Sequence, residues 1–135
     1  MGTVGESIES SGLDVFARSA LHAVTKSIGT NSYKIISPLE IDADQNNYVP
    51  NGFDDASTIR LSAALPVNIS GLKAGKDGDL KRLVNVGAQV ITLLHASALS
   101  SESNRFLCVG SVDATLDVGG MVVIFYDGVT KRWRA

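Results

Sequence analysis

A histidine, three serines and an aspartate in the C-terminal half of the sequence have the residue types of a hydrolytic triad. The histidine would be the general base, a serine the nucleophile, and the aspartate would orient the imidazole; the residues are His95, Ser97, Ser100, Ser101 and Asp113. The sequence has no GxSxG motif to hold a serine on a strained turn. His95 also ends an apolar alternation over 89–95 that is typical of a strand. We therefore expect no enzyme, and we expect His95 to anchor the loop that follows it.

Two further stretches come close to ligand-binding motifs without completing them. The segment 71–78, GLKAGKDG, has three residues between its first glycines where a phosphate-binding loop has four, and Asp77 stands where Ser or Thr is required. Asp42 and Asp44 alternate as at the start of an EF-hand loop, but its twelfth position is Phe53 instead of Glu. We expect no cofactor and no metal, with only an irregular calcium site left open at 42–46.

Composition and charge exclude several function classes. The chain has 135 residues, 44% hydrophobic and 19% charged, as is typical of one folded domain. A net charge of -2 gives no general attraction for nucleic acid, and no run of eighteen apolar residues could span a membrane. The single Cys108 cannot form an internal disulfide, and we expect it to be a buried apolar side chain. Residues 1–10 lack the features of a secretion signal, so we expect a protein made in the cytoplasm.

An amphipathic helix is predicted near the N-terminus. Ser11 is suited to cap its start and Gly29 to end it. We expect residues 1–32 to form a short helix or an extended arm that makes assembly contacts. Apolar residues recur between 11 and 28 at the spacing of one helical face: Leu13, Phe16, Ala17, Ala20, Leu21, Val24 and Ile28.

From residue 33 onward the apolar spacing changes to the period of two that is typical of strands. Tight hairpin turns are predicted at Gly87-Ala88, Gly119-Gly120 and Asp127-Gly128, and a polar surface loop over 42–56. We predict that residues 33–135 form an all-β domain, an antiparallel β-sandwich similar to a jelly roll. The expected strands are 33–36, 39–43, 57–63, 66–70, 80–86, 89–95, 105–109, 114–118, 121–126 and 130–134.

The order of several motifs resembles a β-rich module of tailed-bacteriophage virion proteins, which include head-decoration (cement) and tail-fibre proteins. The resemblance covers roughly residues 40 to 135 and is carried by STIRLSA, VNISGL, GKDGDLKRLVNVGAQVITLLHASALSSESNRF and LDVGGMVVIFYDGVTKRWR. Two departures are mild: Val118 stands where the module often has proline, and Ser70 where it has threonine. The resemblance implies a structural protein of the virion.

The small size of the chain favours a head-decoration protein within that group. We expect it to be a dimer or trimer that binds the major capsid protein or other virion subunits, without nucleic acid or membrane. A tail-fibre or tail-tip module that binds a host receptor or carbohydrate is the alternative. His95, Asn104 and Arg105 are expected to close the two ends of one polar loop, as a clasp. The expected interaction surface comprises Leu13, Phe16, Leu21, Val24, Tyr48, Phe53, Tyr126 and Trp133.

Overall fold

The computed structural model describes residues 34–135, so the helix or arm predicted over 1–32 lies outside the described residues. The described chain consists of short β-strands, three 3-10 helices and loops, and it contains no α-helix. The strands are β1 (Ile35–Ile36), β2 (Thr58–Leu61), β3 (Val67–Ile69), β4 (Leu80–Asn85), β5 (Ile91–Leu93), β6 (Phe106–Leu107), β7 (Ala114–Leu116), β8 (Met121–Asp127) and β9 (Arg132–Arg134). The 3-10 helices are η1 (Phe53–Asp55), η2 (Glu102–Asn104) and η3 (Val109–Ser111).

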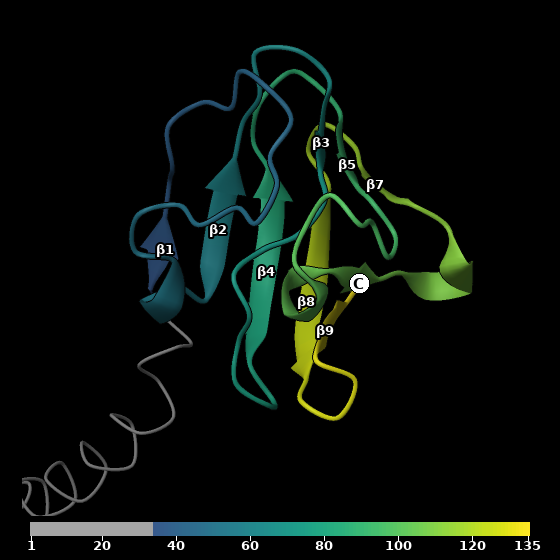
Figure 1. The fold of residues 1–135 in the computed structure, drawn as a ribbon. Helices are drawn as coiled ribbons and strands as arrows, with labels where there is room; N and C mark the ends of the chain where they lie inside the picture. The colour runs from purple at the N-terminus through teal and green to yellow at the C-terminus, as the bar shows by residue number, and fades with distance from the viewer. Residues whose placement is uncertain (1–33) are drawn as a thin grey trace, which may run out of the picture. The chain divides into compact units, whose positions relative to one another are not determined.

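The strands form two mixed sheets (Figure 1). Six strands pair in the order β1-β2-β4-β8-β9-β6, and three in the order β3-β5-β7. Neighbours β1, β2 and β4 run parallel, as do β3 with β5 and β6 with β9. Only the pairs β4–β8, β5–β7 and β8–β9 are antiparallel. The all-β class is confirmed for the described residues, but the antiparallel pairing predicted for a jelly roll is wrong for these parallel strands.

The parallel pairs have a nearly constant register, which shows how the chain winds. Thr58 pairs with Ile35 of the preceding strand and with Arg82 of the following one, and Val67 pairs with Ile91. Parallel partners within residues 35–93 lie 22 to 24 positions apart, including the single bridges Ile41–Ala63, Gln45–Ile69 and Tyr48–Leu72. The pair β6–β9 and the bridge His95–Phe106, nearer the C-terminus, do not follow this spacing. Residues 34–57, 58–81 and 82–105 are therefore three stacked coils, an arrangement in which each unit rests on its neighbour.

The corners of these coils explain why one predicted hairpin is wrong. Gly87-Ala88 does not join paired strands, because β4 and β5 belong to different sheets. The buried Asn85 fixes this corner: its Nδ2 donates to the carbonyl oxygens of Gln89 (2.8 Å) and Leu116 (3.0 Å), and its Oδ1 accepts from the Gly87 N–H (3.1 Å). A side chain on Gly87 would lie 2.9 Å from Cβ of Ser62 in the second coil. The glycine thus permits close stacking of coils.

The other two predicted hairpins have different outcomes. Gly119-Gly120 makes a turn in which Gly120 N–H donates to Asp117 O (2.8 Å), but β7 and β8 lie in different sheets. The hairpin at Asp127-Gly128 is confirmed, because β8 and β9 pair directly. Oδ1 of Asp127 accepts the Val129 N–H at 2.9 Å, which is the local bonding that makes aspartate common in turns.

Apolar side chains of both sheets share one buried cluster. Inward residues alternate with outward ones along each strand, so that Leu83 and Ile124 are buried while Leu80 and Val123 are exposed. Cys108 is buried as predicted, and burial raises the pKa of its thiol. Each large side chain stabilises the fold by about 1.5–3 kcal/mol on burial. The fully buried ones include Ile59, Leu61, Ile69, Leu72, Leu83, Ile91, Leu93, Phe106, Ile124 and Trp133.

Candidate functional site

His95 follows β5 and fastens the next part of the chain to it. Its Nδ1 accepts the N–H of Cys108 at 3.0 Å, and its own N–H donates to Oδ1 of Asp113 at 2.8 Å. These two partners stand at the two ends of η3, where Val109 and the residues after it are exposed. Because Nδ1 accepts this backbone hydrogen bond, the imidazole helps to hold the start of η3 beside the end of β5.

Asn104 and Arg105 fasten the same region to other neighbours. Arg105 Nε donates to the carbonyl oxygen of Ser100 at 2.9 Å, which closes the loop over 96–104 on itself. Asn104 accepts the Ala74 N–H at Oδ1 (2.8 Å) and donates from Nδ2 to Oδ1 of Asn47 (2.9 Å). The three residues proposed as a clasp therefore each bind a different segment, and Asn104 links the third coil to the first and second.

Ser100, one of the three serines of the triad hypothesis, has polar partners in the first and second coils. Ser100 is buried, and its Oγ lies 2.6 Å from Oγ of Ser70 while it accepts the Asn47 N–H at 2.9 Å. Ser70 Oγ also lies 2.6 Å from Oδ1 of Asn46. Asn46, Ser70 and Ser100 belong to successive coils, so these hydroxyls form a polar ladder through the stack. Such a ladder satisfies buried polar groups and fixes the register of the coils.

One of the alternating acidic residues at 42–46, Asp44, also joins successive coils. Asp44 Oδ1 accepts the backbone N–H of Asn68 at 2.8 Å, which joins the first coil to the second. Within residues 34–135, no three His, Cys, Asp or Glu side chains lie together as a metal ion would require. The irregular calcium site left open by the sequence therefore has no such cluster behind it in the described chain.

Three aromatic residues expected on the interaction surface are in the core, which corrects that expectation. Phe53, Tyr126 and Trp133 are 2%, 4% and 0% exposed. The Trp133 ring makes edge contacts with Tyr126 (5.0 Å between centroids) and Phe53 (6.2 Å). Their inward position on the strands buries large apolar areas, and their polar atoms still find partners: Trp133 Nε1 donates to Lys73 O (3.0 Å) and Tyr126 Oη to Ser103 O (2.8 Å).

Of the other residues of that expected surface, only Tyr48 is described by the structure. It is half-buried and belongs to the first coil. Leu13, Phe16, Leu21 and Val24 lie outside the described residues.

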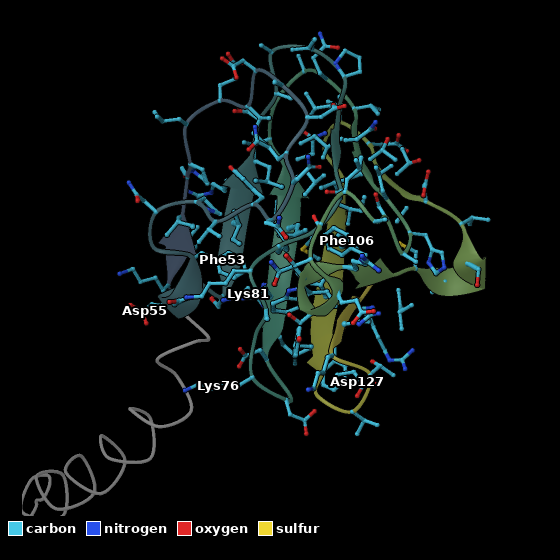
Figure 2. The ribbon with its side chains drawn as sticks, viewed as in Figure 1. Phe53, Asp55, Lys76, Lys81, Phe106 and Asp127 are labelled. Carbon is cyan, nitrogen blue, oxygen red and sulfur yellow. The ribbon has the colours of Figure 1, made fainter. Side chains whose placement is uncertain are left out.

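A buried lysine was missed by the sequence analysis. Lys81 on β4 is 5% exposed, and its Nζ donates to the carbonyl oxygens of Phe53 (2.8 Å) and Ala56 (2.7 Å). The ammonium also lies 4.6 Å from the centroid of the Phe53 ring, and Figure 2 shows the side chain reaching from β4 toward η1. Burial lowers the pKa of Lys81, and the carboxylate of Asp79 partly opposes that shift. This cation holds η1 against the sheet.

The outward side of β4 and β8 carries four exposed apolar side chains around Arg82, and we call this surface the outer face. Leu80 pairs with Phe125 and Val84 with Met121 across the two strands, while Val123 lies between them. Leu80 and Met121 are each 58% exposed, Val123 51% and Phe125 37%. Arg82 lies within this face, opposite Val123, while Arg60 and Arg134 lie at its edges, paired with Val84 and Phe125. Exposed apolar side chains gathered on one face are typical of protein–protein contact.

A second surface feature is a hollow on the first coil, which we call the first-coil hollow. It has a volume of about 350 Å³ and is open to solvent on one side. It lies in the segment that leaves β1 and returns to η1 (Figure 1). Its lining combines prolines, Leu39, Ile41 and Tyr48 with two carboxylates and two carboxamides: Pro38, Leu39, Glu40, Ile41, Asp42, Gln45, Tyr48, Pro50 and Asn51.

Comparison of the chain with protein-family models, with curated proteins and with solved structures finds no match. Within residues 34–135, no helix is long and apolar enough to cross a bilayer. The outer face and the first-coil hollow are therefore interpreted from their own geometry.

Proposed function

We propose that this chain is a structural protein of a bacteriophage virion, a head-decoration (cement) protein that binds the assembled capsid through protein–protein contacts. The observation that carries the proposal is the outer face, where Leu80, Met121, Val123 and Phe125 are exposed together on two paired strands. The order of motifs that resembles virion proteins gives the proposal its context. The protein is made in the host cytoplasm and is located in the virion.

The outer face fits this function because its side chains are held rigidly but left uncovered. Adjacent strands β4 and β8 fix the spacing of the exposed residues, and the buried residues on the inward side of the same strands anchor them. Covering such side chains with a partner removes apolar area from water, at about 25 cal/mol per Å². The flanking Arg60 suits contact with acidic groups at the rim of a partner surface.

A protein that binds only assembled capsid stabilises it by mass action, because binding draws the assembly equilibrium toward the bound state. No turnover is required of such a protein. The proposed partners are the major capsid protein or another virion subunit, together with a second or third copy of this chain, since symmetric oligomers suit the symmetry axes of capsids.

The test is binding of the purified chain to capsids of its phage from which it has been removed. Val123→Glu, on the outer face, should lower the affinity at least tenfold, because it places a charge in the apolar contact. Val129→Glu is the matched control, because Val129 is 89% exposed on the turn between β8 and β9. Equal binding by the two variants would exclude the outer face as the contact, and no binding by the unchanged chain would exclude the function.

A receptor-binding or carbohydrate-binding module of a tail fibre or tail tip is the second candidate. The first-coil hollow favours it, because this hollow lies on the polar segment that would carry such a site. Binding of the isolated chain to host cells or to a glycan array, without affinity for capsids, would support this candidate and exclude the first. The number of copies per virion separates them independently, since hundreds indicate the shell and a few tens or fewer indicate the tail.

A further inference from the structure

We propose that the first-coil hollow binds a cationic side chain, arginine or lysine, presented by a partner protein. The inference rests on the proposed function only in taking that partner to be a virion subunit. The site itself is defined by shape, charge and unused hydrogen-bonding groups, each of which is visible in the described chain.

The shape fits a long side chain with a polar end. A hollow of about 350 Å³ lies at the small end of the range for ligand sites. Its apolar walls are made by Pro38, Leu39 and Pro50, and Leu39 is 91% exposed, so an apolar surface is left uncovered at the rim. Arginine and lysine pack their methylene stems on such surfaces while the charged end reaches a polar group.

The charge of the lining favours a cation. Glu40 and Asp42 line the hollow, and no lysine, arginine or histidine does. Two other acidic residues of the described chain are in ion pairs: Lys73 pairs with Asp54, and Arg134 with Asp127, each at 2.8 Å. Neither pair involves Glu40 or Asp42. Two carboxylates beside one hollow without a cation raise the local negative potential, which a guanidinium or ammonium would neutralise.

Polar groups in the lining of the hollow offer hydrogen-bond acceptors that could orient a bound cation. Within residues 34–135 the hydroxyl of Tyr48 makes no hydrogen bond, and burial raises the pKa of the phenol, which keeps it neutral. A neutral phenol can accept from a guanidinium, and its ring face attracts a cation. Gln45 uses its Nε2 on the carbonyl oxygen of Ala43 at 3.0 Å, which leaves the carboxamide oxygen as an acceptor.

A neutral sugar fits the same hollow less well. Its hydroxyls could donate hydrogen bonds to the carboxylates of Glu40 and Asp42, but they would supply no counter-charge. A cationic side chain supplies both the hydrogen bonds and the counter-charge. Sugar binding is therefore the rival outcome in the test.

The experiment uses the full chain labelled for amide NMR and two acetylated, amidated tripeptides, Gly-Arg-Gly and Gly-citrulline-Gly. Citrulline keeps the size and most hydrogen-bond donors of arginine but has no charge. The arginine peptide should shift the amide signals of Gln45, Tyr48 and Asn51, with an affinity at least tenfold higher than that of the citrulline peptide. Equal responses to both peptides, or no response to either, would overturn the proposal.

Variants separate this site from general charge effects. Glu40→Gln combined with Asp42→Asn should weaken arginine-peptide binding at least tenfold. The matched control, Glu102→Gln combined with Asp117→Asn, removes the same charge from exposed positions that do not line the hollow, and should leave binding within twofold.

A third arm tests neutral monosaccharides on the same amide signals. Shifts with a sugar but not with arginine would overturn the cationic site. If capsid binding fails while the arginine response persists, the proposed function falls and this site stands.

Discussion

The two ends of the coil stack are closed in different ways. At the end formed by β8 and β9, Trp133 and Tyr126 fill the core, and β8 pairs with β4 over five residues while β9 pairs with β8. At the end formed by the first coil, beyond β1, only single bridges join the chain to the second coil, and Leu39 is left exposed. We call these the capped end and the open end.

The contrast separates stability from recognition. The capped end contributes the large buried rings of Trp133 and Tyr126. The open end contributes Ile41 and Phe53 to the same core, but its segment around residues 38–51 is joined to the other coils by separate hydrogen bonds and keeps a hollow. Regions with few buried apolar contacts open more readily than the core, and binding sites are often found in them. The capped end should therefore determine global stability, and the open end should determine what the protein binds.

The largest effect is expected from Trp133→Ala at the capped end. The substitution removes a fully buried ring and leaves a cavity beside Phe53 and Tyr126, so we expect a loss of about 3–5 kcal/mol in the free energy of unfolding. Denaturant unfolding followed by circular dichroism measures it. Trp133→Phe, which keeps a ring, should lose clearly less. A loss below about 1 kcal/mol for the alanine variant would show that the capped end is not the anchor.

A smaller loss is expected from Lys81→Met, which tests the link between β4 and the open end. The change leaves the carbonyl oxygens of Phe53 and Ala56 without their donor, and unsatisfied buried groups cost about 1–3 kcal/mol. Thermal unfolding checks the expected loss of about 2 kcal/mol. Lys76→Met is the control, since Lys76 is exposed on the loop before β4. An unchanged midpoint for Lys81→Met would mean that water replaces the ammonium.

Asn47→Ala tests the open end itself. Asn47 has a φ of 49°, and its Oδ1 accepts from the Ser101 N–H at 2.8 Å. Alanine loses this bond and the one from Asn104 Nδ2, and it is strained at positive φ, so we expect a loss of about 1–3 kcal/mol. Hydrogen exchange should show faster exchange at Ser101 and at Tyr48, with little change at Trp133. Asn47→Gly removes the strain but does not restore the hydrogen bonding, so its free energy of unfolding should lie between those of the unchanged chain and of Asn47→Ala. Faster exchange throughout the chain would contradict the separation of the two ends.

The smallest effect is expected from acid titration of the capped end. Arg134 and then the Val129 N–H lower the pKa of Asp127 below its usual 3.8. The folded state then binds fewer protons than the unfolded state in that range, so the contribution of Asp127 is present above the usual pKa and is lost as the pH falls through the lowered one. Unfolding midpoints between about pH 2 and 5 should show this loss in the unchanged chain and a smaller one in Asp127→Asn. Parallel curves would exclude a contribution from this ion pair.

Most strands could be predicted from the sequence because their signals are local, but the strand predicted over 39–43 is wrong, since only Ile41 is paired there, in a single bridge. The segment 80–86 was predicted and β4 spans Leu80–Asn85, since alternation and flanking turns depend on neighbouring residues. The hairpin at Asp127-Gly128 was predicted for the same reason, and so was the burial of Cys108.

The pairing was not predicted, because parallel partners lie far apart in the sequence. The missed signal is a spacing: Ile59 and Leu83, and likewise Ile69 and Leu93, are partners 24 positions apart. A search for internal repeats would have favoured stacked coils over an antiparallel sandwich.

The candidate sites were predicted less well than the strands. Lys81 could have been found, because it shares the inward positions of β4 with Leu83. Phe53 and Trp133 were expected on the surface because aromatic residues near turns often contact ligands or partner proteins. Both side chains are instead buried in the core. The first-coil hollow is formed by turn residues without periodicity, so only the folded chain brings its lining together.

The position of Trp133 has a consequence for biosynthesis. Its ring contacts Phe53 and its Nε1 binds Lys73 O, so the last strand completes contacts begun in the first and second coils. The contacts among the three coils can form as the chain leaves the ribosome, but one side of their shared core stays uncovered until residues 132–134 are added. A nascent chain arrested before β9 would expose that interior, and it would be the species most prone to aggregate or to need a chaperone.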